Sequence, residues 1–187
     1  GVVFTTPSRG SKNIICAAVR TLLAPGFAAA IEASAAYNEV PLSGFLTVSV
    51  SGLDVKSLRE HILGGFRSRM QFRVRVYRES SRLLPLLGDD MLFEAHPEQT
   101  GRWDPFSSSY ELRFHDGSRR YYSDWEAFFR GFTGLRDFPV PEFGDSRVYI
   151  LVQARFRKMV FNPPLNILSV FLNRYAVASP WFRLDRE

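Results

Sequence analysis

Four arginines recur at alternating positions in two stretches of the chain, Arg73 with Arg75 and Arg155 with Arg157. Successive side chains of a β-strand point to opposite faces, so each pair shares one face of its strand. Guanidinium groups bind phosphate and carboxylate groups through forked hydrogen bonds. If both strands belong to one sheet, these residues predict a basic surface that can bind an anionic ligand.

The same arginines have a second interpretation, which the sequence alone favours. They can be solvated charges on a sheet face, where they oppose pairing at an edge. Like charges placed opposite one another destabilise a sheet. A carboxylate on a neighbouring strand, an intervening strand or an external anion must therefore relieve their repulsion. Glu111 is the candidate internal partner, because it points outward from its own predicted strand.

No other residue types form a recognisable catalytic or metal-binding pattern. The three histidines, His61, His96 and His115, are not spaced as metal ligands usually are. The serines at 107–109 have no nearby base and no glycine-rich elbow. An unrecognised hydrolase would need histidines and carboxylates to converge in a pocket, which their spacing does not require. We therefore expect no enzymatic activity, no metal and no cofactor.

Composition and charge are those of a globular chain rather than a nucleic-acid-binding one. Hydrophobic residues make up 45% of the 187 residues, which is enough for one domain with its own core. The formal net charge of +5 is spread along the chain, so we expect no nucleic-acid partner. The single cysteine, Cys16, excludes an internal disulfide.

Alternation of apolar and polar residues predicts most of the fold. The longest alternating stretch, Asp145 to Val160, predicts a half-buried antiparallel strand that ends before Pro163. Shorter strands are predicted at 45–51, 67–78, 91–95, 110–114, 119–122 and 174–184, the last interrupted at Pro180. We predict a mainly β fold, an antiparallel β-sandwich-like domain with two short helices, at about residues 54–64 and 123–132, packed on the sheet.

The second predicted helix carries an aromatic stripe that fits the core better than a cofactor. Ser123 is predicted to begin it, with Glu126 completing a capping box. The stripe has spacing i, i+3, i+4 and i+7 and consists of Trp125, Phe128, Phe129 and Phe132.

Asp116-Gly117 predicts a two-residue hairpin turn with positive φ at both positions. Residues 97–101 are predicted to form a loop.

Residues 8–35 resemble an export signal in their order of features. Arg9 and Lys12 precede an apolar stretch at 14–27, and Ala33-Ser34-Ala35 matches a small-x-small cleavage site. The apolar stretch is too short and interrupted to predict a membrane span. The alternative is a helix that packs on the domain. We expect an export signal or membrane-attaching segment at 1–35 and a single β-rich domain at 36–187.

The C-terminal part of the chain resembles a family of bacterial exported proteins, the domain of unknown function 4390. The resemblance rests on Arg155-Phe156-Arg157, on Pro163-Pro164-Leu165 and on Ser179-Pro180-Trp181. Arg102-Trp103, Tyr110-Glu111-Leu112 and the Asp116-Gly117 turn before Ser123 extend it over roughly residues 44–184. The first proline of the family's Leu-Pro-x-Pro-Leu motif is shifted here, and its first leucine is absent. The resemblance implies an exported, membrane-associated domain and brings no catalytic residues.

Two functions are consistent with these observations. The first is a non-enzymatic module or scaffold of the bacterial cell envelope, in the periplasm, that binds another protein. An apolar surface patch that includes Leu83–Leu87 would support it. The N-terminal segment could also associate it with the membrane. The alternative is binding of an anionic lipid or glycan head group on the face formed by Arg73, Arg75, Arg155 and Arg157.

Overall fold

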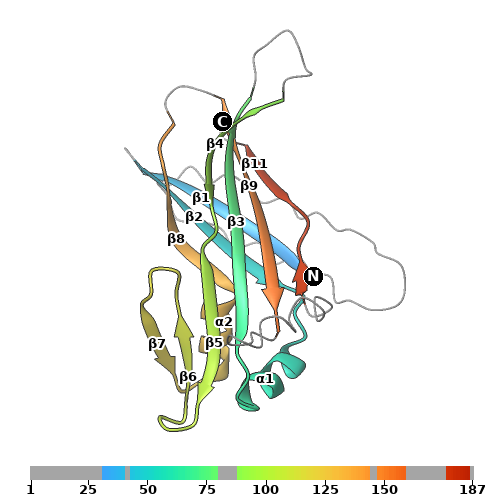
Figure 1. Ribbon diagram of the computed structural model, residues 1–187. Coiled ribbons are helices and arrows are strands. Elements are labelled where there is room, and N and C mark those ends of the chain that lie inside the picture. Colours follow the sequence, from blue (N-terminus) through green and yellow to red (C-terminus); the bar gives the residue numbers. More distant parts are fainter. Residues whose placement is uncertain (1–30, 41–42, 80–87, 144–146, 159–175, 186–187) are drawn as a thin grey trace, which may run out of the picture.

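Two antiparallel sheets pack face to face, with two short helices at one end (Figure 1). The computed structural model describes residues 31–40, 43–79, 88–143, 147–158 and 176–185. The strands in this part of the chain are β1 (Glu32–Val40), β2 (Ser43–Ser51), β3 (Ser68–Arg78), β4 (Asp90–Ala95), β5 (Glu98–Asp104), β6 (Ser109–Arg113), β7 (Arg119–Tyr122), β8 (Gly134–Val140), β9 (Val148–Arg157), β10 (Ala176–Ala178) and β11 (Phe182–Asp185). The helices are α1 (Val55–Leu63) and α2 (Trp125–Phe132). The predicted mainly β, sandwich-like fold is confirmed.

The larger sheet is built around the long antiparallel pair β3 and β9. Their register runs from Arg69 opposite Arg157 to Arg78 opposite Val148. β5 and β4 both pair with the other edge of β3, β5 near the start of β3 and β4 near its end. β10 and β11 likewise both pair with the other edge of β9. β4 is separated from β5 near Pro97, and β10 from β11 near Pro180, because proline has no N–H to donate to the ladder. The strands β6 and β7 extend the sheet beyond β5, and the smaller sheet has the order β1-β2-β8.

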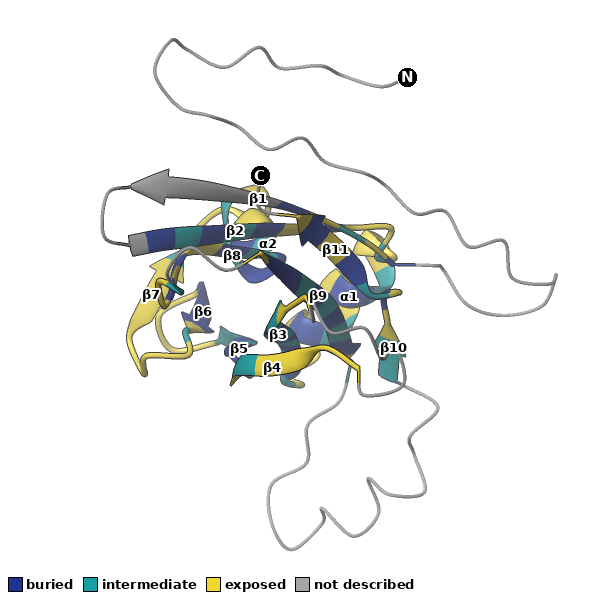
Figure 2. Cartoon of the chain, turned by 90° about the horizontal axis from the view of Figure 1, so that it is seen from above, coloured by how far each residue is buried: buried dark blue, intermediate teal, exposed yellow. Residues whose placement is uncertain are grey.

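The core lies between the two sheets (Figure 2). Alternate residues of β3 and β9 are buried, as the sequence predicts, and point toward β2 of the smaller sheet. The buried apolar residues of these three strands are Met70, Phe72, Val74, Val76, Val148, Ile150, Val152, Ala154, Phe156, Leu46, Val48 and Val50. Their burial provides the main stabilisation of the sandwich, since apolar area removed from water is the dominant favourable contribution.

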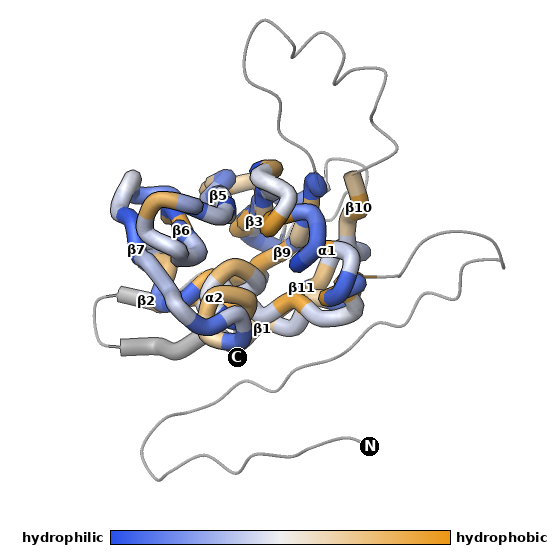
Figure 3. The backbone as a smooth tube through the Cα atoms, turned by 90° about the horizontal axis from the view of Figure 1, so that it is seen from below, coloured by the Kyte–Doolittle hydropathy of each residue, from blue (hydrophilic) through white to orange (hydrophobic). Residues whose placement is uncertain are grey.

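Helix α2 buries three of the four residues of its aromatic stripe against the larger sheet, which confirms the core interpretation, while Phe129 is half-buried. Phe128 and Phe132 are fully buried, and Trp125 is 5% exposed. Figure 3 shows hydrophobic residues along α2 and hydrophilic ones along β7. The N-cap is Asp124 and not Ser123, because the Asp124 carboxylate accepts a hydrogen bond of 2.8 Å from the backbone N–H of Ala127.

Two further local predictions are wrong. Residues 97–101 are not a loop, since β5 begins at Glu98. The turn between β6 and β7 has a positive φ of 84° at Gly117 and none at Asp116. The N–H of Gly117 donates to the carbonyl of Phe114, whose own N–H donates to the carbonyl of Ser118. These bonds define a three-residue turn with a glycine bulge, which needs only one residue in the left-handed region.

The domain begins earlier than the sequence predicts. Ala33-Ser34-Ala35, the expected cleavage site, lies inside β1 and pairs with β2. Ile31 and Ala35 are each 2% exposed and belong to the core. The boundary predicted at Ala36 therefore falls inside a strand, and the described part of the domain includes the residues from Ile31 onward. The basic and apolar parts of the predicted export signal lie outside the described residues, and export stays a prediction.

No helix in the described part of the chain is long and apolar enough to cross a membrane.

Candidate functional site

The four predicted arginines share the outward face of the larger sheet. β3 and β9 are direct neighbours, with Gln71 opposite Arg155 and Arg73 opposite Gln153. Because the intervening residues of both strands are buried in the core, the arginines project away from it. The two arginine-bearing strands therefore lie side by side in one sheet, which is the condition that the sequence interpretation set for a shared basic surface.

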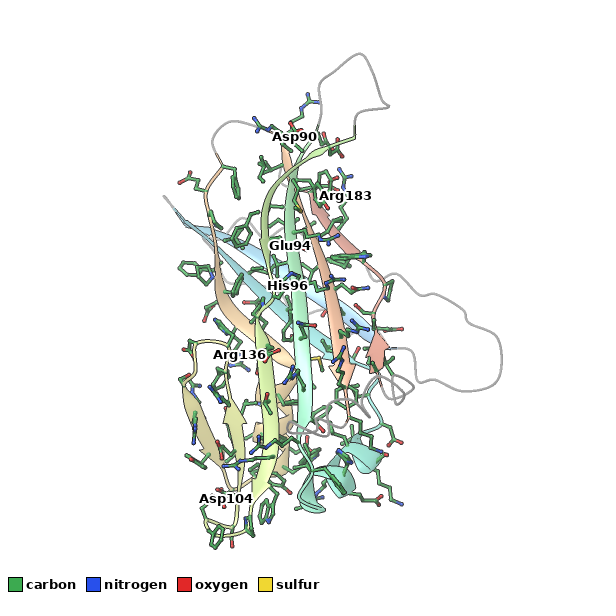
Figure 4. All side chains as sticks on the ribbon, viewed as in Figure 1. Asp90, Glu94, His96, Asp104, Arg136 and Arg183 are labelled. Atoms are coloured by element: carbon green, nitrogen blue, oxygen red, sulfur yellow. The ribbon has the colours of Figure 1, made fainter. Side chains whose placement is uncertain are left out.

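Arg75 is neutralised by a partner within the sheet. Its Nε donates a hydrogen bond of 2.7 Å to Oε1 of Glu94 on β4, directly across the ladder. This bond raises the pKa of Arg75 and lowers the pKa of Glu94. The Arg75 guanidinium also lies 5.0 Å from the ring centroid of Trp181. His96 Nε2 lies 3.5 Å from the same Glu94 carboxylate (Figure 4).

Glu111 is not the partner of the predicted arginines. It is 4% exposed on β6, where Nε of Arg102 donates to its carboxylate at 2.7 Å. Nε of Arg119 lies 3.6 Å from its other oxygen. β5 lies between β6 and β3, so Glu111 forms ion pairs with arginines of the adjacent strands and not with those of β3. On β5, the carboxylate that approaches β3 is that of Glu98, which lies 3.4 Å from Nη1 of Arg69.

A small hollow lies where β3 begins and β9 ends, and it is lined by Arg69, Gln71, Arg155 and Arg157. We call it the arginine hollow. Its volume is about 110 Å³. A water molecule occupies about 30 Å³ in the liquid, so the space suits a carboxylate or phosphate group. Within the described ranges, Arg155 and Arg157 have no carboxylate within 4.0 Å.

Arg69 supplies the most specific feature of the arginine hollow. Its Nε is buried, and no group in the described part of the chain accepts a hydrogen bond from it. A buried donor without an acceptor is costly, and anions bound to guanidinium groups satisfy such donors. The sequence interpretation missed Arg69 and Gln71. Both continue the alternation of Arg73 and Arg75 toward the start of β3, so extending the pattern backwards would have found them.

At the opposite end of the same face, the charged side chains contact one another within the protein. Arg183 lies 3.8 Å from the ring centroid of Tyr149, and it pairs with Glu79 and Asp185, at 2.6 Å each. The hydroxyl of Tyr149 donates to Asp89 at 2.7 Å. Burial, and then this bond, raises the pKa of Tyr149 to about 12. These charges stabilise the sheet, and the arginine hollow is the part of the face that offers donors to a ligand.

The described ranges contain no group of three or more His, Cys, Asp or Glu side chains that could hold a metal ion. The fold and the arginine hollow define the chain as an antiparallel β-sandwich with a basic sheet face. No family model, curated protein or solved structure matches it. The resemblance to domain of unknown function 4390 therefore stays a prediction.

Proposed function

We propose that the chain is a non-enzymatic binding module of the bacterial cell envelope that holds an anionic head group in the arginine hollow. The observation that carries the proposal is the buried, unpartnered Nε of Arg69, beside two arginines that lack carboxylate partners in the described ranges. An anion placed there accepts hydrogen bonds from several guanidinium groups at once. It also relieves the repulsion between Arg69 and Arg157, which face one another across the ladder.

Vesicle co-sedimentation tests the proposal. Vesicles that contain phosphatidylglycerol should bind the wild-type protein at low salt and release it as salt rises, because exposed charge interactions are screened. The double variant Arg155→Ala/Arg157→Ala should bind weakly at either salt concentration. A matched control, Arg78→Ala/Arg113→Ala, removes the same charge from exposed positions outside the arginine hollow and should bind like the wild type. An equal loss of vesicle binding in both variants would show that binding depends only on net charge and not on the arginine hollow.

Two further comparisons identify the chemistry. Arg155→Lys/Arg157→Lys keeps the charge but removes the forked geometry, so binding should fall between the wild type and the alanine variant. Inorganic phosphate added as a competitor separates a free anion from a lipid head group. If phosphate displaces the protein from vesicles, the arginine hollow recognises the phosphate itself. Binding that is equal on neutral phosphatidylcholine vesicles would contradict the proposal.

A protein partner is the second candidate function. Phe106 favours it, because this large apolar side chain is 98% exposed in the turn between β5 and β6. Leu83–Leu87, the apolar segment that the sequence suggests for such a surface, lie outside the described residues. A pull-down from envelope extracts should use the whole chain and a Phe106→Ser variant. A partner that both baits retain equally would not use this surface.

A location in the periplasm is part of the same proposal. The sequence order of basic residues followed by an apolar stretch supports it. Residues 1–40, fused to a reporter that is active only in the periplasm, should give signal, and residues 31–40 alone should not. An inactive, cytosolic reporter with residues 1–40 would count against export.

A further inference from the structure

A second and larger cavity opens at the edge of the sandwich. It lies between β8, an edge strand of the smaller sheet, and the hairpin of β6 and β7, which ends the larger sheet, with α2 alongside. Its volume is about 510 Å³. Sites for small molecules typically measure about 300–1,000 Å³. We call this cavity the edge cleft, and none of its lining residues belongs to the arginine hollow.

Three arginines from three different elements line the edge cleft. Arg120 lies on β7, Arg130 on α2 and Arg136 on β8. Figure 4 shows Arg136 beside the hairpin of β6 and β7. In the described part of the chain, no carboxylate lies within 4.0 Å of their guanidinium nitrogens. Two carboxylates also line the cleft, Asp116 and Asp137. Asp116 accepts a hydrogen bond of 2.8 Å from the N–H of Ser118 and keeps its negative charge. Three arginines outnumber the two carboxylates, so the lining keeps an excess of positive charge.

A bulge in β8 directs polar side chains toward the edge cleft. Leu46 and Val48 of β2 pair with Phe138 and Leu135 of β8, so one β2 residue faces the two residues Arg136 and Asp137. Leu135 and Phe138 both remain buried, while Arg136 and Asp137 are both exposed and line the cleft. Asp137 has a φ of 49°, a conformation that non-glycine residues rarely adopt. Bulges and such strained residues concentrate at binding sites, where they redirect side chains.

Gln99 gives the edge cleft a buried polar group without a partner. The side chain is 1% exposed, and its Nε2 donates a hydrogen bond of 2.7 Å to the carbonyl of Gly134. That bond fixes the orientation of the amide. Its Oε1 is buried and accepts no hydrogen bond from the residues that the structure describes. A buried acceptor of this kind requires a donor, from water or from a ligand.

We propose that the edge cleft is a binding site for a small polar molecule that carries a carboxylate or phosphate group together with a hydroxyl. Arg120, Arg130 and Arg136 bind the anionic group, and Oε1 of Gln99 accepts the hydroxyl hydrogen. This site is independent of the arginine hollow, since it lies on other elements and uses other arginines.

NMR titration of the ¹⁵N-labelled chain tests the proposal with three probes, inorganic phosphate, citrate and glucose 6-phosphate. Glucose 6-phosphate should shift the backbone amides of Gly131 and Gly134 and should bind more tightly than inorganic phosphate, which lacks the carbon-bound hydroxyl. The variant Arg120→Gln/Arg136→Gln should weaken binding about tenfold or more, as expected when charge-assisted hydrogen bonds are lost. The control Arg78→Gln/Arg113→Gln, outside the cleft, should bind like the wild type.

Three results would overturn the proposal: no probe shifts the cleft amides, the cleft variant binds as tightly as the control, or the shifts disappear in Arg155→Ala/Arg157→Ala. The last result would place the binding in the arginine hollow. Equal affinity for glucose 6-phosphate and inorganic phosphate would overturn the role of Gln99. If the cleft double variant does not fold, the single variant Arg130→Gln, on the exposed side of α2, replaces it.

Discussion

The hydroxyl of Tyr149 donates a hydrogen bond of 2.7 Å to Oδ2 of Asp89, although 60 residues separate them in the chain. Tyr149 lies near the start of β9, and Asp89 directly precedes β4. The two strands flank opposite sides of β3. The bond therefore ties the larger sheet together across its central strand. The ring of Tyr77 on β3 stacks on Tyr149 at 5.4 Å between centroids.

This bond predicts a loss of stability in alkali. Burial and Asp89 raise the pKa of Tyr149 from 10.0 to about 12, so the folded state favours the neutral phenol. The stabilisation is complete below pH 10 and is lost between pH 10 and about 12, because the phenol ionises in the unfolded chain while the folded protein still holds its proton. Urea unfolding across this range should show a steeper decline for the wild type than for Tyr149→Phe. Parallel curves would show that Tyr149 does not carry the pH dependence.

Close packing of Gly101 against Phe128 gives a second prediction. A Cβ at Gly101 would lie 2.6 Å from Cζ of Phe128, whose ring is fully buried. Gly101→Ala should lower the free energy of unfolding by about 1–3 kcal/mol through overpacking. Phe128→Ala should lower it by about 3–5 kcal/mol through the cavity it leaves.

The double variant Gly101→Ala/Phe128→Leu separates steric clash from other causes. Because the smaller side chain makes room for the added methyl, the combined loss should be less than the sum of the losses in Gly101→Ala alone and Phe128→Leu alone. Chemical denaturation of all three variants measures the difference. Strict additivity would mean that the two residues do not oppose one another.

Simple alternation allowed much of the fold to be predicted, because strands that bury one face repeat every second residue. β3 follows this pattern, and β9 follows it except at Tyr149, which is buried on the outward face. β8 was missed, since its bulge at Arg136 and Asp137 interrupts the period and Pro139 argues against a strand. β1 was missed because its small residues also match a cleavage site. Both are edge strands, where packing and not local pattern decides the structure.

The start of α2 distinguishes a sequence prediction from the observed cap. Ser123 and Asp124 both suit an N-cap position, but the Asp124 carboxylate makes the bond to Ala127. Asp124→Ala should lower the free energy of unfolding by about 0.5–2 kcal/mol. Ser123→Ala, at an exposed neighbouring position, should leave it nearly unchanged. Thermal or urea unfolding compares them, and a larger effect at Ser123 would restore the capping-box prediction.

The candidate sites were less predictable than the fold. Alternation placed the arginines on one face, but it did not show which carboxylates reach them. Glu94 neutralises Arg75 because β4 pairs with the second half of β3. That pairing depends on the interruption between β4 and β5 near Pro97. A pattern of alternating residues does not predict where such an interruption falls. The edge cleft brings together residues from three strands, the turn between β6 and β7, and a helix, so no single stretch of sequence indicates it.

Ser179 takes the place of a strand residue at the break between β10 and β11. Its N–H donates to the carbonyl of Ala154 at 2.8 Å, and its Oγ accepts the N–H of Ala154 at 2.9 Å. Nε2 of Gln153 donates to the Ser179 carbonyl at 3.0 Å. The hydroxyl thus satisfies a backbone donor in the middle of β9 that the interrupted ladder would otherwise leave buried and unpaired.

Ser179→Ala should therefore lower the free energy of unfolding by about 1–3 kcal/mol, the cost of a buried donor without an acceptor. Ser179→Thr keeps the hydroxyl and should lose less, unless its added methyl overpacks a site where Ser179 is only 2% exposed. Hydrogen exchange supplies the decisive measurement, since the Ala154 amide should exchange faster in Ser179→Ala than in the wild type, while the Val152 amide, paired with β11, keeps its protection. Uniform acceleration of both amides would indicate general destabilisation and would contradict a specific role of the Ser179 hydroxyl.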